Sequence, residues 1–311
     1  MSNGMNELMA EGTVRGTSSD GGAQVAPVRE QREMCGNSAC AGGWLAFLRD
    51  RRRPVFDRRW GCSTKCLETM VRAAVQRESG EGDTEERSTE HRHRMPLGLI
   101  LLAQGLITQA QLEHALDRQR RAGEGRIGRW LTQECGLDPR CITRGLGVQW
   151  GCPVLSMEGF DAGRMALAVP RLLVEQTGLL PLRIAGGRTL QLAFADRPDA
   201  SAALAVERMS GLKVESGLMN PAEWQAGRDR MFACSFVEAA FDLVAEIESL
   251  PGRIAVELRR MQPMASRLVR VHEFYWLRMW LESAAMRTRD GGLPWTREDV
   301  ADRLYAVGRE Q

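Results

Sequence analysis

The sequence predicts an α+β protein assembled from several small units rather than from one core. Its 311 residues exceed what one small core needs, and 43% of them are hydrophobic. Three observations carry the prediction: a duplicated stretch with helical periodicity, a following stretch with period-two alternation, and a cluster of four cysteines. The expected units are a disordered tail (1–30), a four-cysteine zinc-finger-like unit (31–77), a charged linker (78–94), a tandem-motif helical subdomain (95–150), a small α/β subdomain (151–231) and a C-terminal helical region (232–311).

The four-cysteine unit follows a tail that is rich in Gly, Ser, Ala and Glu and lacks periodicity. The cysteines have the spacing C-x4-C, then a 21-residue loop, then C-x3-C. Four thiolates bind Zn(II) tetrahedrally, and a unit of this size rarely folds without a staple. The segment GCSTKCLETMVRAAV resembles treble-clef zinc fingers, with four ordinary thiols as the alternative. The predicted ligands of a structural Zn(II) are Cys35, Cys40, Cys62 and Cys66.

The loop between the cysteine pairs contains the basic segment RDRRRPVFDRRW, in which aromatic residues are interleaved. This composition is typical of contact with nucleic acid or with an acidic protein partner. Asp50 and Asp57 interrupt the segment, and the formal net charge of the whole chain is only +2. A strongly electrostatic role for the whole chain is therefore not indicated. The linker that follows is charged and free of apolar residues, which predicts a solvated segment.

A 24-residue pattern occurs twice in the next unit, as Pro96–Gln119 and as Arg126–Gln149. Each copy predicts a hairpin of two short helices, because apolar residues recur at helical spacing on both sides of a loop. We expect Gly105 to end the first helix, Thr108 to cap the second and Asp138 to cap the fourth. An internal duplication builds two similar half-sites, which a two-fold ligand can bridge.

The rhythm changes after Gly151. The stretches PVLSM, GLLPLRI, TLQLAFAD and LKVES predict short strands, the third because it alternates and follows a Gly-Gly turn. Helices are expected at PRLLVEQT, 199–210 and 221–231. From Phe232 onward the pattern predicts helices at FVEAAFDLVAEIE, GRIAVELRRM, SRLVRVHEFYWLRMWLESAAMR and TREDVADRLYAVG.

Residues 96–231 resemble the N-terminal domain of type II secretion and type IV pilus assembly ATPases. The tandem motif of that family reads R-L-G-x-x-L-x-x-x-G-x-I-x-x-x-x-L-x-x-A-L-x-x-Q and binds cyclic di-GMP. An Arg at the head of a copy supplies a planar donor fork for phosphate or guanine, and a glycine lets a ligand approach the backbone. The resemblance implies a cyclic di-GMP site formed by Leu97, Gly98, Leu101, Gln119, Arg126, Ile127, Gly128, Leu131 and Gln149.

The two copies depart from the family motif at three positions. Pro96 stands where the first copy would have Arg, Cys135 stands where the second would have Gly, and Gly145 replaces Ala. One of two guanidinium groups is therefore missing, and the loss of a charge-assisted contact costs about 1.5–3 kcal/mol. A loss of about 1.5–3 kcal/mol corresponds to binding that is roughly ten- to hundredfold weaker, so we expect weakened or abolished binding of cyclic di-GMP. Arg94 lies two residues early and would substitute only if the loop refolds.

The ATPase domain of the family is not evident in this sequence. A Walker A loop needs G-x-x-x-x-G-K-[ST], and neither Lys65 nor Lys213 stands in that context. There is no run of 18 apolar residues and no export signal pattern. We therefore expect a non-enzymatic regulatory protein of the bacterial cytoplasm that binds cyclic di-GMP.

Two alternatives of other classes stay open. One is a ligand-free scaffold that docks on pilus or secretion assembly proteins, which the departures at Pro96 and Cys135 favour. The other is a zinc-dependent nucleic-acid-binding protein that uses the basic loop between the cysteine pairs.

Overall fold

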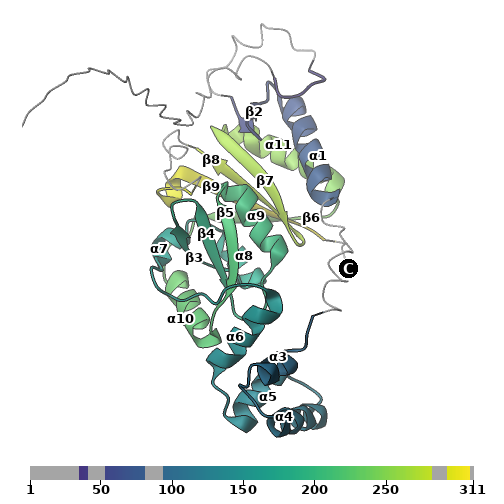
Figure 1. Ribbon diagram of the computed structural model, residues 1–311. Coiled ribbons are helices and arrows are strands. Elements are labelled where there is room, and N and C mark those ends of the chain that lie inside the picture. The colour runs from purple at the N-terminus through teal and green to yellow at the C-terminus, as the bar shows by residue number, and fades with distance from the viewer. Residues whose placement is uncertain (1–34, 41–52, 81–93, 282–292, 309–311) are drawn as a thin grey trace, which may run out of the picture.

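The computed structural model describes residues 35–40, 53–80, 94–281 and 293–308. Three layers follow one another along the molecule (Figure 1). A cluster of four helices lies at one end, a three-stranded sheet with its helices lies in the middle, and a four-stranded sheet covered by two helices lies at the other end. The α+β class predicted from the sequence is confirmed. Within the described residues no helix combines the length and the hydropathy needed to cross a membrane.

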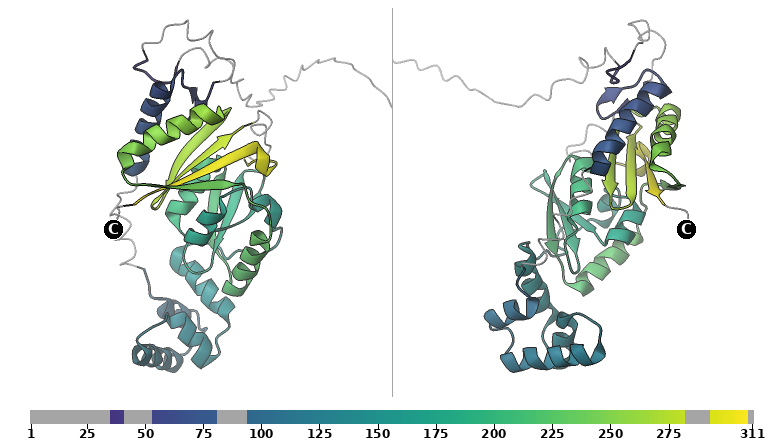
Figure 2. Two further views of the ribbon diagram at one scale, coloured as in Figure 1. Left: turned by 180° about the vertical axis from the view of Figure 1, so that it is seen from behind. Right: turned by 90° about the vertical axis from the view of Figure 1, so that its right-hand side faces the viewer.

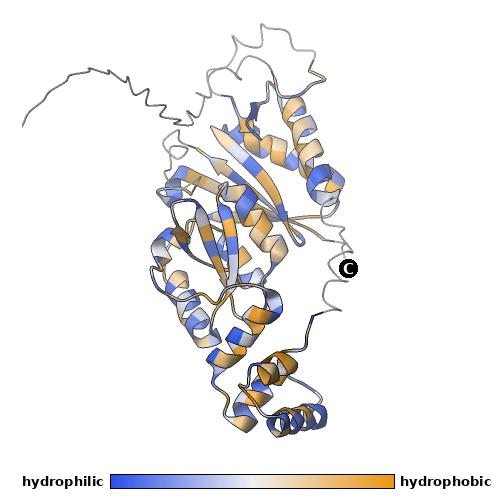
Figure 3. Ribbon diagram, in the orientation of Figure 1, coloured by the Kyte–Doolittle hydropathy of each residue, from blue (hydrophilic) through white to orange (hydrophobic). Residues whose placement is uncertain are grey.

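The two motif copies form the four helices α3 (Leu97–Ala103), α4 (Gln109–Ala122), α5 (Ile127–Cys135) and α6 (Pro139–Trp150). The predicted caps are confirmed: Thr108 and Gln111 form a capping box at α4, and the Asp138 side chain accepts from Arg140 N at α6. Helix α3 is hydrophobic along its length (Figure 3) and buries Leu97 and Leu101. These caps and this apolar helix make the hairpin pair a locally encoded unit.

The helices of one copy pack against those of the other. Helix α3 of the first copy lies on α6 of the second, and α5 of the second lies on α4 of the first. Within each copy a glycine permits the close crossing: an added Cβ at Gly98 would lie 2.6 Å from Leu112 Cδ1, and one at Gly128 would lie 2.9 Å from Ile142 Cγ2. The two glycines and their partners occupy equivalent motif positions, so the duplication is also a structural one.

The middle layer contains α7 (Ala162–Met165), α8 (Arg171–Thr177), β3 (Leu180–Ala185), β4 (Thr189–Phe194), α9 (Ala200–Ser210), β5 (Lys213–Leu218) and α10 (Pro221–Phe232). The sheet order is β3-β4-β5, with β3 antiparallel and β5 parallel to β4. Three of the four predicted strands are confirmed. The remaining prediction, PVLSM, is not a strand and contributes only an isolated bridge between Val154 and Leu218.

The prediction of a helical C-terminal region is wrong for most of its length. The region consists of β6 (Ala239–Val244), the 3-10 turn η4 (Ile247–Ser249), α11 (Leu250–Met261), β7 (Ala265–Val271), β8 (Phe274–Trp280), the 3-10 turn η6 (Arg297–Asp299) and β9 (Val300–Val307). Of the four predicted helices, only the GRIAVELRRM stretch is an α-helix (α11) within the described residues. The strands form a sheet in the order β6-β9-β8-β7.

Strand β8 shows why the pattern misled. All seven of its residues are buried, because both faces of the sheet are covered. Tyr275, Leu277 and Met279 belong to the core under α1 and α11, whereas Phe274, Trp276 and Trp280 belong to the core of the middle layer. A run of apolar residues without polar alternation does not distinguish a buried strand from a buried helix.

The four-cysteine unit shares its core with the C-terminal sheet. It contains the short strands β1 (Val55–Phe56) and β2 (Arg59–Trp60) and the helix α1 (Thr64–Gly80). Helix α1 lies beside α11 on one face of the sheet (Figure 2), and both helices contribute to one hydrophobic cluster with β7, β8 and β9. Val55 N donates to Pro263 O at 3.0 Å, and Ser266 Oγ donates to Val55 O at 2.8 Å. Segments far apart in sequence therefore form one body, and residues 94–236 are inserted into it.

The start of the predicted linker is also corrected. Glu78 lies in the last turn of α1 and is buried, and it accepts a hydrogen bond from Arg270 N of β7 at 3.2 Å. The rest of the linker prediction, residues 81–93, lies outside the described residues, as do the predicted tail and residues 41–52.

A buried ion pair joins β8 and β9 of the four-stranded sheet, and its arginine also contacts the middle layer. Arg278 Nη2 lies 2.7 Å from Asp302 Oδ2, with both side chains almost fully buried. Trp276 Nε1 also donates to Asp302, and Arg278 Nη1 donates to the Ala168 carbonyl at 3.0 Å. Each of these contacts satisfies a buried polar group, as burial of charge requires.

Candidate functional site

Both motif copies line one cavity of about 850 Å³. The first copy contributes Leu97, and the second contributes Arg126, Ile127, Gly128 and Gln149. The opposite wall comes from the middle layer, where the β4–α9 loop (195–199) supplies Ala195, Asp196 and Arg197. The cavity therefore lies between the helical hairpins and the three-stranded sheet. Its size is within the ordinary range of small-molecule sites.

Four predicted site residues do not line this cavity: Gly98, Leu101, Gln119 and Leu131. Leu101 and Leu131 have no exposed surface and form the core of the hairpin pair. Gly98 faces Leu112, so its lack of a side chain serves helix packing. Gly128, its equivalent in the second copy, serves packing in the same way but also lines the cavity.

The closing glutamines of the two copies make reciprocal contacts. Gln119 Nε2 donates to the Gly125 carbonyl at 2.6 Å, and Gln149 Nε2 donates to the Met95 carbonyl at 2.8 Å. Each acceptor is the residue just ahead of the head of the other copy. The glutamines therefore fix the backbone from which Pro96 and Arg126 start. Gln149 lines the cavity as well, whereas Gln119 does not.

Arg126 is the predicted guanidinium of the second copy. It is 78% exposed and lies at the start of α5, with Nη1 2.9 Å from Asp196 Oδ2 across the cavity. An ion pair this exposed contributes between about zero and 1 kcal/mol, because water and salt screen it. The Arg126 side chain is therefore held toward the cavity by a contact that a bound anion can replace.

Arg94 supplies a second guanidinium to the same cavity. Its Cζ lies 3.8 Å from the centroid of the Trp150 ring, and the residue lines the same cavity as Arg126. Its Nη1 is buried and finds no hydrogen-bond partner within the described residues. The 24-residue motif does not include Arg94, which lies two positions before the first residue of the first copy. Trp150, directly after the closing glutamine, was likewise missed.

The four predicted metal ligands lie together. The Sγ atoms of Cys35, Cys40, Cys62 and Cys66 are all within 4.8 Å of one another. The Cys40–Cys62 and Cys62–Cys66 sulfur distances are both 3.5 Å. A tetrahedral Zn(II) with Zn–S bonds of about 2.3 Å needs sulfurs about 3.8 Å apart. The group therefore has the spread that one metal ion of this kind requires.

Hydrogen bonds make one of these thiols acidic. Burial alone would raise the pKa of Cys66, but hydrogen bonds with the Ser63 and Asn37 side chains and with neighbouring thiols lower that pKa to about 7. Asn37 Nδ2 lies 3.4 Å from Cys66 Sγ. Burial raises the pKa of Cys35. The thiolate is the form that binds metal, so Cys66 is the best prepared of the four.

The glycines beside the cysteines act through close packing rather than through turn geometry. An added Cβ at Gly36 would lie 2.5 Å from Arg59 Cβ, and one at Gly61 would lie 2.5 Å from Leu67 Cδ2. Gly36 N donates to the Trp60 carbonyl at 2.8 Å. These contacts bring the loop of the first cysteine pair against β2 and against the start of α1.

The basic segment between the cysteine pairs is described only from residue 53 onward. Within that part the interleaved aromatics Phe56 and Trp60 are buried in the protein core. They are therefore not available to stack on bases, which removes the aromatic half of the argument for nucleic acid.

Comparisons with known proteins give matches among solved structures. No family model and no curated protein matches the sequence. A structure of MshE with cdg matches at 26% identity over 44% of this chain and 99% of that chain, with a TM-score of 0.37. The N-terminal domain of XpsE matches in two crystal forms, at 20% identity over 43% of this chain and 92% of that chain (TM-score 0.30), and at 21% identity over 48% and 96% (TM-score 0.26). Each of these three matches covers less than half of this chain and more than nine tenths of the solved one.

Proposed function

We propose that this chain is a non-enzymatic regulatory protein that binds cyclic di-GMP in the cavity between the motif helices and the β4–α9 loop. The observation that carries the proposal is that both motif copies line one cavity, and that Arg94 and Arg126 are among the four arginines that line it. In this proposal, the guanidinium group of Arg94 replaces the one that is missing from the first copy, where Pro96 stands in place of Arg.

The lining of the cavity suits a nucleotide with two phosphates and two flat bases. Guanidinium groups bind phosphate oxygens with paired hydrogen bonds and stack on aromatic rings. The Arg94–Trp150 stack offers such a planar surface, and Leu97, Ile127 and Ile142 supply apolar walls. The unpartnered Nη1 of Arg94 is a buried donor that an acceptor on the ligand would satisfy.

Titration calorimetry of the full chain with cyclic di-GMP tests the proposal. Saturable binding is expected, and Arg126→Ala and Arg94→Ala should each weaken it ten- to hundredfold, because each removes a charge-assisted contact of about 1.5–3 kcal/mol. Arg140→Ala is the matched control, since Arg140 is exposed on α6 and does not line the cavity.

Absence of binding at protein concentrations suited to micromolar affinity would reject the ligand. Binding that survives both cavity variants unchanged would reject the site. In the first case the ligand-free scaffold becomes the better hypothesis, and co-purification with pilus or secretion assembly proteins is the measurement to make.

We also infer that Cys35, Cys40, Cys62 and Cys66 hold a structural Zn(II). The compact arrangement of the four sulfurs supports this, and so does the position of the cluster at the start of α1, where it would secure the first cysteine loop to the shared core. Metal analysis of the purified protein should find one zinc per chain, and Cys62→Ser should lose it and lower the melting temperature. A metal-free protein with unchanged stability in that variant would contradict the inference.

A further inference from the structure

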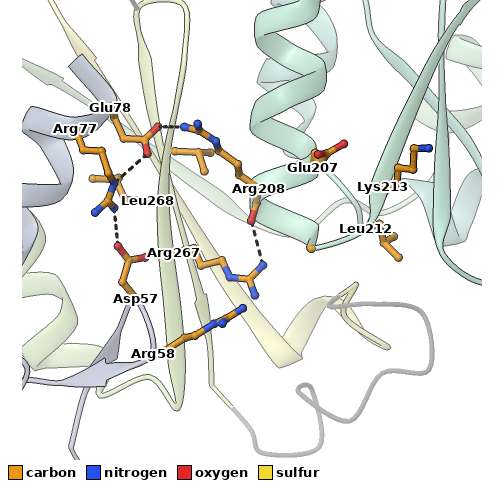
Figure 4. Close-up of a pocket in the computed structure, with 12 residues that line it drawn as sticks. Asp57, Arg58, Arg77, Glu78, Glu207, Arg208, Leu212, Lys213, Arg267 and Leu268 are labelled. Atoms are coloured by element: carbon orange, nitrogen blue, oxygen red, sulfur yellow. Dashed lines mark hydrogen bonds and ion pairs between the residues drawn. The ribbon is translucent and has the colours of Figure 1, made fainter. Parts of the chain in front are cut away.

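A second cavity, of about 610 Å³, lies where three distant segments meet. Its walls come from the β1–β2 turn and the end of α1, from the end of α9 and the start of β5, and from β7 (Figure 4). It shares no lining residue with the cavity proposed for cyclic di-GMP. It joins the inserted middle layer to the body that carries the cysteine cluster.

The carboxylates of this second cavity are already engaged. Asp57 Oδ2 lies 2.8 Å from Arg77 Nη2, and Glu207 Oε2 accepts from Val214 N at 2.8 Å. Glu78 lies 3.5 Å from Arg208 and 3.9 Å from Arg77, and it accepts from the Arg270 backbone. Three cationic side chains lining the cavity have no carboxylate partner within the described residues: Arg58, Lys213 and Arg267.

Arg267 is held in place by neutral groups. Its Nη1 donates to the Arg208 and Met209 carbonyls, at 3.1 and 2.7 Å, at the C-terminal end of α9. Burial lowers the pKa of the Arg267 guanidinium, and the positive charge of Arg58 lowers it further. Figure 4 shows the Arg58 and Arg267 side chains extending in the same direction toward the open space of the cavity. The exposed Arg58 and the half-buried Arg267 are thus two like charges near each other, and the neighbouring Asp57 carboxylate, which forms an ion pair with Arg77, only partly offsets their effect.

Arg58 is presented by an unusual backbone. Asp57 and Arg58 are the two loop residues of the β1–β2 hairpin, and both have positive φ, 47° and 66°. Hairpins of this kind strongly prefer Asn-Gly or Asp-Gly, because a side chain is strained at the second position. A residue kept in a strained conformation points to a use for its side chain. Here the side chain is an exposed guanidinium without an ion-pair partner in the described residues.

We propose that this second cavity binds the phosphate group of a small ligand through Arg58, Arg267 and Lys213. Guanidinium and ammonium groups that are not paired with a carboxylate favour an oxyanion with several acceptor oxygens, and the repulsion between Arg58 and Arg267 in the free site adds to the gain on binding. The three cations come from the β1–β2 turn, from β7 and from β5. A bound ligand would therefore contact both the inserted layer and the body that carries the cysteine cluster.

The test is titration calorimetry of the full chain carrying both Arg94→Ala and Arg126→Ala, which remove the two guanidinium groups proposed to bind phosphate in the first cavity. The probes are inorganic phosphate, pyrophosphate and guanosine 5′-monophosphate. Saturable binding of at least one probe is expected. A tighter fit for the ester assigns the site to a phosphorylated ligand, and equal or weaker binding of the ester assigns it to the free anion.

The decisive variant is Arg58→Gly, with Arg58→Asn beside it. Both remove the guanidinium while fitting the positive φ better than Arg does, so the melting temperature should hold or rise while affinity falls about tenfold or more. Lys213→Gln should weaken binding less, and Arg140→Gln is the control outside the cavity. Absence of binding by every probe would overturn the proposal, as would affinity unchanged in Arg58→Gly. Neither result bears on cyclic di-GMP, which the first cavity is proposed to bind.

Discussion

The junction of the two sheets and the rim of the first cavity use the same ion pair, an arginine with an aspartate, in opposite surroundings. At the junction, Arg278 and Asp302 are 1% and 0% exposed, and further hydrogen bonds saturate both groups. At the cavity, Arg126 and Asp196 are 78% and 58% exposed, and neither has another ion-pair partner in the part of the chain that the structure describes. The buried pair cannot be opened without leaving a bare charge in the core, whereas the exposed pair exchanges partners freely. One region is thus built to persist and the other to respond.

The largest effect is expected at the buried pair. Arg278→Ala leaves the Asp302 carboxylate buried with only Trp276 as a donor side chain, and should lower the free energy of unfolding by about 3–5 kcal/mol. Urea denaturation followed by tryptophan fluorescence measures it. Arg297→Ala removes an exposed pair with Glu298 and serves as the control, with little expected change. A loss below about 1 kcal/mol for Arg278→Ala would break the comparison.

An intermediate effect is expected at a half-exposed pair between the layers. His272 Nε2 in the β7–β8 turn lies 2.6 Å from Asp199 Oδ2 at the start of α9. The hydrogen bond with Asp199 raises the pKa of His272, and burial opposes that shift. Burial alone would raise the pKa of Asp199, but the hydrogen bond with His272 lowers it.

The pH dependence follows from these directions. The raised pKa of His272 gives stability that is fully present below its unfolded pKa of about 6.5 and is lost as pH rises through the folded pKa. The Asp199 part is lost only as pH falls through its lowered folded pKa. The melting temperature should therefore fall as pH rises above neutrality. The corresponding loss in the free energy of unfolding should be less than about 1 kcal/mol, because the pair is partly exposed. In His272→Asn, which suits the positive φ of 53°, that fall should be absent. If the variant showed the same dependence of melting temperature on pH, the His272–Asp199 pair would not be its cause.

The smallest effect on stability is expected at the cavity rim. Asp196→Ala should change the free energy of unfolding by no more than about 0.5 kcal/mol, because the pair it breaks is fully solvated. It should strengthen cyclic di-GMP binding severalfold, since Arg126 no longer has to leave a carboxylate. Asp117→Ala breaks a similarly exposed pair with Arg120 away from the cavity and is the control for calorimetry. Weaker binding in Asp196→Ala would show that Asp196 contacts the ligand instead.

Local signals in the sequence were enough for the motif helices. Thr108 and Asp138 act on backbone groups within three residues of themselves, so their roles are readable from spacing alone. The cysteine cluster was predictable for a related reason, because the spacing of thiols carries the chemistry of the ion they would share.

Long-range packing explains what could not be predicted. Strand β8 is covered on both faces, so it lacks the polar alternation that marks a half-buried strand. The core shared by α1 and the C-terminal sheet joins segments nearly two hundred residues apart, and no local pattern encodes that pairing. In the cavity, Asp196 was missed, and Arg94 was expected to substitute for the missing guanidinium only if the loop refolds, because the fold, rather than the motif, brings both residues into the same cavity as Arg126.

The insertion of residues 94–236 into the body formed by the two chain ends sets an order of events during synthesis. Ser79 of α1 contacts Tyr275 of β8 at 2.8 Å across 196 residues of sequence. At about 5–20 residues per second, the ribosome needs roughly 10–40 s to make that stretch. The inserted layer can therefore fold while α1 still lacks its neighbours. A metal ion bound by the four cysteines would hold the first-made segment in its folded shape during this interval, so zinc supply should affect the yield of folded chain as well as its stability.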